Sequence, residues 1–287
     1  MELSLLHFLE NIRSDIATFF ACIFSLCGET LFLVLAVCLI YWLVDKKLGE
    51  KFILVSFSSM SVNGFLKNAV CRPRPYVNGI TRVEIDTPFL STMSLDTNAS
   101  FPSGHSQMGA GLFFTSALHV KKRWAWIVFP LITLGVMLSR LYLGVHYPSD
   151  VLVGATLGIS FAFFGEWILA KHEAKKYAVF AGFALLSILF CLLFPSKNMV
   201  ELCACSLSSA ICMPIENKFI RFENPTNGKN KFFRTLLGIA LVGLVFVLFS
   251  YLPLPFLQLW RWKFIKYALT IATASLLVPY LFKKLKI

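Results

Sequence analysis

The chain has 287 residues, of which 57% are hydrophobic and only 15% are charged, and this balance is not that of a soluble globular protein. One water-soluble core could not bury its 29 phenylalanines and 6 tryptophans, because a domain of this size still exposes a substantial part of its surface. The composition predicts an integral membrane protein and excludes a disordered chain, a collagen and a soluble dehydrogenase.

The chain carries a formal net charge of +12, from 27 Lys and Arg against 15 Asp and Glu. A strongly basic protein can bind nucleic acid, but such a protein clusters its basic residues on one face together with aromatic ones. Here the basic residues stand in short groups between apolar runs, as topological anchors do in membrane proteins. We therefore expect no nucleic-acid partner.

The first predicted element is a short amphipathic segment. Residues 1–13 place Leu5, Leu9 and Ile12 on one helical stripe, which favours a helix that lies in the membrane interface over one that crosses it. The segment lacks a basic n-region and a small-residue cleavage site, so we expect no cleaved signal peptide.

Nine apolar runs follow along the chain. A transmembrane helix needs about 20 apolar residues, and several runs are shorter because a helix inside a bundle can continue past its apolar stretch. The predicted fold class is all-α, a polytopic transmembrane helical bundle of about nine spans. These spans lie near 20–44, 52–66, 106–120, 124–138, 151–169, 177–194, 202–215, 235–252 and 264–282.

Basic groups between the spans predict how the bundle is oriented. In the nine-span layout they fall on one side, which the positive-inside tendency assigns to the cytoplasm. The N-terminus and segments 67–105 and 139–150 then lie on the extracytoplasmic face. Spans 52–66 and 106–120 are rich in Ser, Gly and Thr, residues that face other helices rather than lipid. We expect these two spans at the centre of the bundle.

The first polar constellation begins at the outer end of the second span. Lys67 is followed seven residues later by Arg74, and the pair supplies a compact charge and a planar fork suited to a tetrahedral oxyanion. Basic residues at span ends often only snorkel to the interface. Four of them between residues 67 and 82 on the outer side oppose the positive-inside tendency, which indicates an anionic ligand.

The second constellation, Phe101-Pro-Ser-Gly-His105, comes immediately before the third span. Ser103 can cap this helix, Gly104 lets the backbone approach a ligand, and the N–H groups of the first turn attract an anion. His105 would then lie beside the bound anion. The same residues are also compatible with an ordinary turn and helix cap.

The third constellation lies between the fourth and fifth spans, where Arg140, His146 and Asp150 are spaced as R-x5-H-x3-D. Pro148 disfavours helix before it, so we expect His146 on a loop and Asp150 in the first turn of the next helix. A carboxylate near a histidine keeps one ring nitrogen protonated and leaves the other as a nucleophile or base. Taken alone, the segment could equally be a capped helix with an interfacial histidine.

Together the patterns K-x6-R-P, P-S-G-H and S-R-x5-H-x3-D resemble the signature of the type 2 phosphatidic acid phosphatase (PAP2) family, which shares it with the vanadium haloperoxidases. The resemblance covers roughly residues 29–170 and implies a PAP2-like core. It implies that His146 attacks phosphorus to form a phosphohistidine, that Asp150 orients it, and that His105 protonates the leaving alkoxide and later activates water. It also implies that the non-bridging oxygens are held by Lys67, Arg74, Ser103, Gly104 and Arg140.

The resemblance implies no cofactor and no metal, since cationic side chains and helix N–H groups can take the place of the metal that other phosphatases need. The sequence offers no Asp and Glu cluster suited to Mg²⁺. Cys203 and Cys205 form C-x-C without a nearby His, so we expect no metal there either. The eight cysteines fall almost entirely within apolar runs, and we expect no disulfide framework.

The predicted layout departs from that of the six-span bacterial members of this family. Only the interfacial segment precedes the span at 20–44, and four spans follow the core. Nine spans with an outer N-terminus are similar to the glucose-6-phosphatase and sphingosine-phosphate phosphatase branch. We divide the chain into an interfacial segment 1–19, a catalytic core 20–174 and a four-span extension 175–287. The extension could widen a lipid entrance, form a homodimer face or bind regulators.

The expected function is that of a multi-pass phosphatase of a bacterial cell membrane, which hydrolyses lipid phosphate or diphosphate monoesters at the extracytoplasmic face. Candidate substrates are undecaprenyl diphosphate, phosphatidic acid or phosphatidylglycerophosphate, and sphingoid-base phosphate. Two alternatives stay open, a lipid phosphotransferase that uses the same phosphohistidine and a non-catalytic lipid-binding or transport bundle of the same fold. Glu29, inside the first span, is expected to hydrogen-bond within the bundle.

Overall fold

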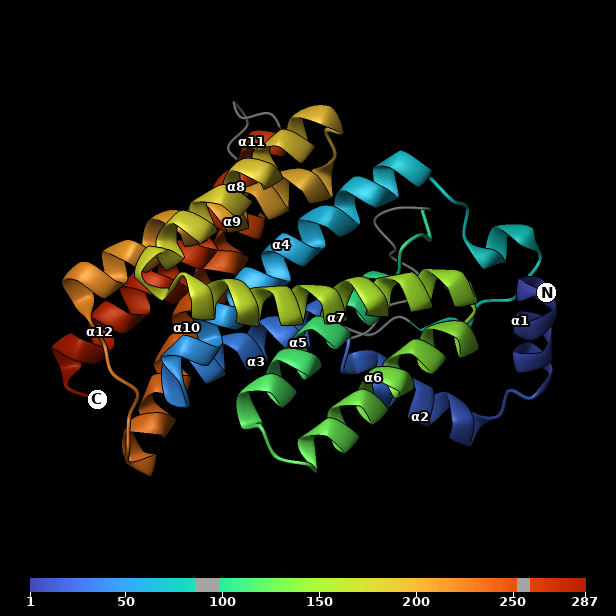
Figure 1. Cartoon of the computed structure of the whole chain (residues 1–287), viewed down its shortest axis with the longest axis horizontal. Coiled ribbons are helices and arrows are strands. Elements are labelled where there is room, and N and C mark those ends of the chain that lie inside the picture. The colour runs from blue at the N-terminus through green and yellow to red at the C-terminus, as the bar shows by residue number, and fades with distance from the viewer. Residues whose placement is uncertain (86–98, 252–258) are drawn as a thin grey trace. The chain divides into compact units, whose positions relative to one another are not determined.

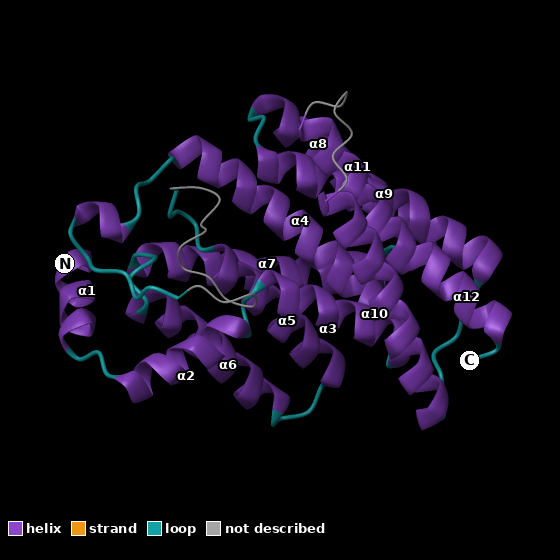
Figure 2. Ribbon diagram, turned by 180° about the vertical axis from the view of Figure 1, so that it is seen from behind, coloured by secondary structure: helices purple, strands orange, loops and turns teal. Residues whose placement is uncertain are grey.

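The computed structural model describes residues 1–85, 99–251 and 259–287, so part of the predicted extracytoplasmic segment 67–105 lies outside it. Helices and short loops make up the described residues, with one isolated β-bridge between Pro73 and Ala99 (Figure 1, Figure 2). The predicted all-α fold class is thus confirmed for this part of the chain. Its α-helices are α1 (Glu2–Asn11), α2 (Asp15–Leu26), α3 (Thr30–Leu43), α4 (Lys46–Val70), α5 (Gly104–Val120), α6 (Ala125–Tyr142), α7 (Pro148–Lys171), α8 (Lys176–Leu193), α9 (Lys197–Ile215), α10 (Gly228–Tyr251), α11 (Leu259–Ala272) and α12 (Val278–Leu285).

Shorter helical segments connect some of these helices. They are the 3₁₀ helices η1 (Pro75–Asn78) and η2 (Glu173–Lys175) and the π-helices η3 (Glu216–Ile220) and η4 (Thr273–Leu277). Because η4 runs between α11 and α12, the last predicted span is one long helical segment with a π-turn inside it.

The described residues contain six helical segments that are long and apolar enough to cross a membrane. They are Ala125–Tyr142, Pro148–Lys171, Glu173–Leu193, Lys197–Ile220, Gly228–Tyr251 and Trp260–Leu285. Helices α2 and α3 make a seventh if they count as one bent span. Helices α4 and α5, which contain the predicted spans 52–66 and 106–120, are not among them.

The first predicted span, 20–44, is a bent pair of helices rather than one continuous helix. Helix α2 ends at Leu26, α3 begins at Thr30, and their axes differ by 46°. The apolar pattern continues through the break, which is why hydropathy alone reads one span. The break leaves Gly28 and Glu29 outside both helices.

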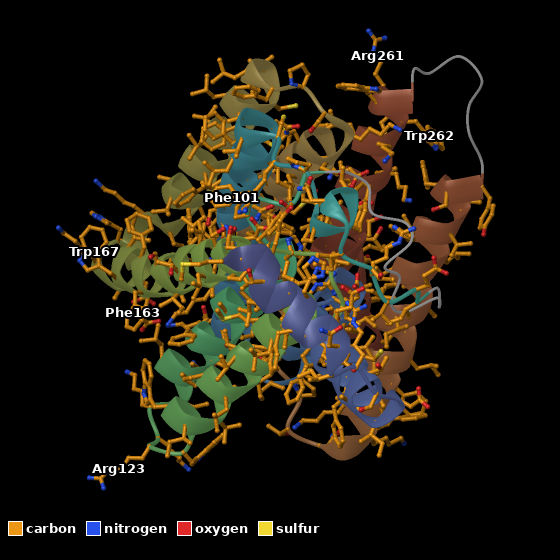
Figure 3. The ribbon with its side chains drawn as sticks, turned by 90° about the vertical axis from the view of Figure 1, so that its right-hand side faces the viewer. Phe101, Arg123, Phe163, Trp167, Arg261 and Trp262 are labelled. Atoms are coloured by element: carbon orange, nitrogen blue, oxygen red, sulfur yellow. The ribbon has the colours of Figure 1, made fainter. Side chains whose placement is uncertain are left out.

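Residues 1–35 and 62–167 form one compact unit. Within it α6 packs against both α2 and α5, and α1 buries Leu6 in a cluster with Ile80 and Tyr147. Helix α7 points Phe163 and Trp167 outward (Figure 3), where they are 46% and 53% exposed. Large apolar side chains on an outer face are what a lipid-facing helix requires.

Helix α7 lies unusually close to the beginning of α5. A Cβ atom added to Gly154 would lie 2.5 Å from the carbonyl oxygen of Ser103, so only glycine fits there. One turn earlier, the carbonyl oxygen of Asp150 accepts a hydrogen bond from the backbone N–H of Ser103 over 3.0 Å. This packing joins the second and third polar constellations.

Residues 36–61 and 168–287 form the second compact unit. Its core contains Tyr41, Trp42 and Phe282, and Nε1 of Trp42 donates a hydrogen bond to the carbonyl oxygen of Ala274 over 2.9 Å. The fully buried carboxylate of Glu216 is paired with Lys46. The unit is therefore a packed bundle with its own core.

Candidate active site

Segments from distant parts of the sequence meet in the first unit, where α4 ends and α5 and α7 begin. Lys67 lies in the last turn of α4, Ser103 caps α5, and His146 lies on the short loop between α6 and α7. The backbone N–H of Ser100 donates to the carbonyl oxygen of Arg72 over 2.8 Å, which fixes the chain before α5 to the chain after α4. The structure thus brings the three predicted constellations together.

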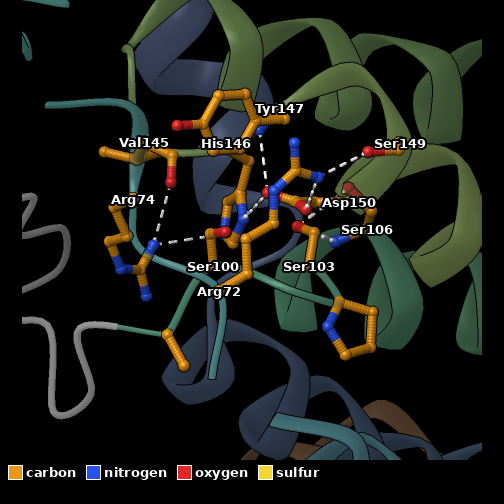
Figure 4. Close-up of polar contacts among 12 residues, drawn as sticks. Arg72, Arg74, Ser100, Ser103, Ser106, Val145, His146, Tyr147, Ser149 and Asp150 are labelled. Carbon is orange, nitrogen blue, oxygen red and sulfur yellow. Dashed lines mark hydrogen bonds and ion pairs between the residues drawn. The ribbon is translucent and has the colours of Figure 1, made fainter. Parts of the chain in front are cut away.

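Asp150, in the first turn of α7, is fully buried and lies beside His146 (Figure 4). Its Oδ2 accepts a hydrogen bond from the backbone N–H of Tyr147 over 2.8 Å and lies 3.5 Å from Nδ1 of His146. A carboxylate facing Nδ1 favours the tautomer that carries its proton there. The lone pair of the imidazole is then on Nε2.

The imidazole of His146 is 2% exposed and lies outside the helices. Burial lowers the pKa of His146 well below its ordinary value, and the positive charges of Arg74, Lys67 and Arg140 lower it further. His146 is therefore neutral at neutral pH. The neutral form is the one that can attack an electrophile.

Two basic side chains, those of Arg74 and Lys67, act electrostatically on His146. Nη1 of Arg74 donates a hydrogen bond to the carbonyl oxygen of Val145 over 3.0 Å and lies 3.4 Å from Nε2 of His146 (Figure 4). Nζ of Lys67 donates to the carbonyl oxygen of Ala99 over 3.1 Å. Burial lowers the pKa of Arg74, but a guanidinium is so basic that it stays charged.

Arg140, in the last turn of α6, is fully buried and only partly satisfied. Its Nη1 donates a hydrogen bond to Oγ of Ser25, whereas its Nε and Nη2 have no hydrogen-bond partner among the described residues. A buried donor without a partner is costly, and native structures rarely leave one. The two open donors fit oxygens of a bound anion.

The beginning of α5 adds polar groups to the same place. Oγ of Ser103 accepts hydrogen bonds from the backbone N–H of Ser106, at 3.4 Å, and from its hydroxyl, at 3.1 Å. Gly104 opens the helix without a side chain. The free N–H groups and the dipole at a helix N-terminus favour an anion, as the sequence predicts here.

The second histidine, His105, is paired with a carboxylate from another helix pair. Nε2 of His105 lies 2.9 Å from Oε2 of Glu29, which belongs to the break between α2 and α3. The expectation that Glu29 hydrogen-bonds within the bundle is therefore confirmed.

The sequence pattern placed Arg72 only among four basic residues that indicate an anionic ligand, and it gave no signal for Glu2. Arg72 donates from Nη1 to Oδ1 of Asp150 over 3.0 Å and to Oγ of Ser149 over 2.6 Å, and its Nη2 lies 2.6 Å from Oε2 of Glu2. Its guanidinium also lies over the ring of Tyr147, 3.8 Å from the centroid. The only sequence signal was a second arginine in the Arg-Pro-Arg-Pro stretch.

The polar groups have no arrangement suited to a metal ion. Within the part of the chain that the structure describes, no three His, Cys, Asp or Glu side chains come together to hold one. The carboxylates near the site face basic partners instead, Asp150 facing Arg72 and His146, and Glu29 facing His105.

Two family models match the chain. The model described as PAP2 superfamily matches residues 48–174, and the model described as PAP2 superfamily phosphatase, transmembrane extension, matches residues 200–287. The first range contains all eight predicted site residues. The second lies within the predicted extension.

Curated proteins of several organisms are similar to the chain. The bacitracin transport permease protein BcrC of Bacillus licheniformis is 37% identical over 34% of this chain and 41% of its own length. The lipid A 4'-phosphatase of Bacteroides thetaiotaomicron is 26% identical over 58% and 75%. The dihydrosphingosine 1-phosphate phosphatase of Saccharomyces cerevisiae is 26% identical over 63% and 46%. The chain thus spans less than two thirds of the first and third of these relatives.

Among solved structures, the chain is similar to the crystal structure of Aquifex aeolicus LpxE. The TM-score is 0.46 and the sequence identity 26%, over 57% of this chain and 93% of that one.

Proposed function

We propose that the chain is a PAP2-type, metal-independent membrane phosphatase that hydrolyses lipid phosphate or diphosphate monoesters through a phosphohistidine, and the two matching family models support this assignment. One observation carries the proposal most directly. The fully buried Arg140 has two unpaired donors, in the same cluster as a buried, neutral His146. A phosphate ester fits such a site, because its anionic oxygens can bind the open donors of Arg140 and its electrophilic phosphorus can be attacked by His146.

The proposed reaction has two steps. Nε2 of His146 attacks phosphorus while Asp150 holds the proton on Nδ1, and the bond to the leaving oxygen breaks as His105 gives that oxygen a proton. In the second step His105 takes a proton from water, the resulting hydroxide attacks the phosphohistidine, and inorganic phosphate leaves His146 free. Protons and charges balance over the cycle, because His105 ends as it began.

The charge that develops on the non-bridging oxygens needs stabilisation from fixed donors. Lys67, Arg74 and Arg140 supply it as side chains, and Ser103 and Gly104 supply it through the beginning of α5. These cations are held by contacts with protein oxygens, Lys67 with Ala99 and Arg74 with Val145, so they need little reorganisation. We infer that no metal is required.

We further propose that α4 and α5 also cross the membrane, which gives the nine-span layout. Helix α4 has 25 residues and α5 has 17, so they are about 38 Å and about 26 Å long at 1.5 Å per residue. Some of their polar side chains bond within their own helices, as Oγ of Ser58 does to the carbonyl oxygen of Leu54 and Oγ1 of Thr115 to that of Gly111. Polar residues satisfied in this way can face a bundle interior.

In that layout the site opens to the extracytoplasmic face, because the basic groups fall in loops on the other side. The substrate would keep its tail in the outer leaflet while its phosphate enters the site. The division into an interfacial segment 1–19, a core 20–174 and an extension 175–287 is supported by the two matched ranges. The relatives named as lipid A and dihydrosphingosine phosphate phosphatases support a lipid phosphate as the substrate class.

The test is phosphate release by the detergent-purified full chain in EDTA, measured with prenyl diphosphates, phosphatidate, sphingoid phosphates and glucose 6-phosphate. We expect release from at least one lipid, inhibition by orthovanadate, and none with His146→Ala, whose folding is checked by its elution volume and thermal midpoint. Undiminished release by His146→Ala would contradict the mechanism. No release from any substrate would instead favour a phosphotransferase or a lipid-binding protein.

A further inference from the structure

The carboxylate of Glu29 is fixed on two sides at the break between α2 and α3. Its Oε2 lies 2.9 Å from Nε2 of His105, and its Oε1 accepts a hydrogen bond from the backbone N–H of Thr30, at the beginning of α3, over 3.2 Å. The second contact holds the carboxylate at a helix N-terminus, where a negative charge is favoured. Glu29 therefore stays ionised and aimed at His105.

The break itself is packed against the first turn of α5. A Cβ atom added to Gly28 would lie 3.1 Å from Cβ of His105, 3.1 Å from the carbonyl oxygen of His105 and 2.8 Å from Cγ1 of Val136. A side chain at this position would therefore require Val136 and the first turn of α5 to shift. The contact between Glu29 and His105 is thus a feature of the fold, since the backbone beside it has no room to move closer and is held by α5 and α6.

We propose that Glu29 is a positioning residue that keeps a proton on Nε2 of His105, so that Nδ1 is the nitrogen that exchanges a proton with the substrate. The proposal rests on the proposed function. In the first step the imidazolium of His105, paired with Glu29, gives its Nδ1 proton to the leaving oxygen and becomes neutral. In the second step Nδ1 takes a proton from the attacking water, and the imidazolium is restored.

The carboxylate is needed because the surroundings of His105 oppose a positive charge. Burial and the guanidinium groups of Arg140 and Arg74 act against a positive charge on His105, and the carboxylate of Glu29 acts in its favour. Without Glu29 the imidazole would hold the proton that a general acid needs still less firmly. Asp150 with His146 and Glu29 with His105 are then two carboxylate–imidazole pairs, one for the nucleophile and one for the acid.

This role makes a prediction about substrates. An alkoxide leaves poorly without a proton, whereas p-nitrophenolate and the phosphate monoester released from a prenyl diphosphate leave well without one. Loss of a general acid should therefore slow the hydrolysis of alkyl phosphate monoesters much more than that of p-nitrophenyl phosphate or of prenyl diphosphates. Glu29 thus equips the site for phosphate monoesters of lipid alcohols.

The experiment compares kcat/KM of the full chain for phosphatidate and for p-nitrophenyl phosphate, in wild type, Glu29→Gln, His105→Gln and the double variant. This ratio reports the steps up to formation of the phosphohistidine. We expect Glu29→Gln to lower kcat/KM for phosphatidate by about 10²-fold, the order of a general acid's contribution, and to change that for p-nitrophenyl phosphate far less. The double variant should lose no more than His105→Gln does.

Asp15→Asn is the matched control, since Asp15 is an exposed carboxylate in the first turn of α2; its substrate preference should equal that of wild type. Equal losses on both substrates in Glu29→Gln would mean a structural role and overturn the inference, as would no loss on either. If Glu29→Gln does not fold, Glu29→Asp replaces it, and the same selective loss is expected from its shorter reach. If the wild-type chain is inactive on both of these substrates but hydrolyses a prenyl diphosphate, this inference is overturned and the proposed function stands; if it hydrolyses none of the lipids, both are overturned.

Discussion

Arg72 joins Asp150 to the first helix of the chain, because its Nη1 donates to Oδ1 of Asp150 over 3.0 Å while its Nη2 lies 2.6 Å from Oε2 of Glu2. Oε1 of Glu2 in turn accepts a hydrogen bond from the backbone N–H of Ser149 over 2.8 Å, at the beginning of α7. Helix α1 therefore reaches two residues that adjoin Asp150, Arg72 and Ser149. The same contacts lower the pKa of Glu2 despite its partial burial, which opposes them.

We predict that Arg72→Lys lowers kcat/KM by about tenfold, the effect of losing one hydrogen bond to a charged group. The planar guanidinium of arginine contacts Asp150, Ser149 and Glu2 through separate nitrogens, and the single nitrogen of a lysine ammonium cannot reproduce this arrangement. Asp150 would then be held less firmly against Nδ1 of His146. Steady-state kinetics on a lipid phosphate would measure the loss, and an unchanged kcat/KM would show that the other hydrogen bonds of Asp150 are enough to hold it.

A second prediction separates the role of Glu2 from simple docking of α1. Glu2→Gln should weaken the contact with Arg72 and lower kcat/KM by several-fold. Glu10→Gln is its control, because Oε1 of Glu10 accepts a hydrogen bond from the backbone N–H of Thr81 over 3.1 Å and has no contact with Arg72. We expect Glu10→Gln to stay within about twofold of wild type. If kcat/KM fell equally in both variants, the effect would come from weaker packing of α1 in general, and not from the contact between Glu2 and Arg72.

The pH dependence follows from the charges around His146. Burial and the charge of Arg74 lower the pKa of His146, so the imidazole remains neutral, and able to attack, to lower pH than an ordinary histidine would. Activity falls only as pH drops through that lowered pKa. Arg74→Gln removes one of the causes and raises the pKa, so the acid limb of kcat/KM should move to higher pH. An acid limb that stays in place, or moves to lower pH, would contradict this reading.

The predicted site residues could be found from the sequence because each sits at a helix end with a recognisable spacing. Lys67 and Arg74 flank the end of α4, Ser103 begins α5, and Asp150 begins α7. Local rules for caps and for Pro fix these positions before any tertiary contact forms. Their proximity then follows once the helices pack side by side.

The partners of these residues could not be found in the same way. Glu2 and Arg72 are 70 residues apart, and Glu29 and His105 are 76 apart, so their contacts depend on tertiary packing. The bend at Gly28 was missed because the apolar run passes through it. The predicted count of nine spans goes beyond the six or seven helical segments of the described residues that are long and apolar enough to cross a membrane, because α4 is too polar and α5 too short to be among them.

Arg140 offers a test of the anion site itself. Arg140→Lys keeps a charge but loses the two open donors and the contact with Ser25, so we expect inhibition by orthovanadate to weaken by at least about tenfold, as for a lost charged hydrogen bond. Ser25→Ala removes only the partner of Nη1 and should weaken inhibition less than Arg140→Lys does. Dose–response curves for orthovanadate would measure the loss of inhibition in each variant. Unaltered inhibition in Arg140→Lys would mean that its open donors do not face the anion.

The close approach of α7 to α5 gives the last prediction. Gly154→Ala would place a methyl group 2.5 Å from the carbonyl oxygen of Ser103, and the backbone cannot yield without separating Ser103 from Asp150. Overpacking of this kind costs about 1–3 kcal/mol, so the thermal midpoint in detergent should fall. The value of kcat should fall with it, since the Ser103 cap and Asp150 belong to one hydrogen-bonded arrangement.

Gly182→Ala is the matched control for this prediction. Gly182 lies in the interior of α8, and a Cβ atom there would have no atom within 4 Å. Alanine in an open helix position is more favourable than glycine by about 0.5–1 kcal/mol, so the midpoint should hold or rise and kcat should not change. If both variants lowered the thermal midpoint equally, the destabilisation would be a general effect of replacing a helical glycine, and the prediction would be wrong. A fall confined to Gly154→Ala would tie stability and turnover to the contact between α7 and the beginning of α5.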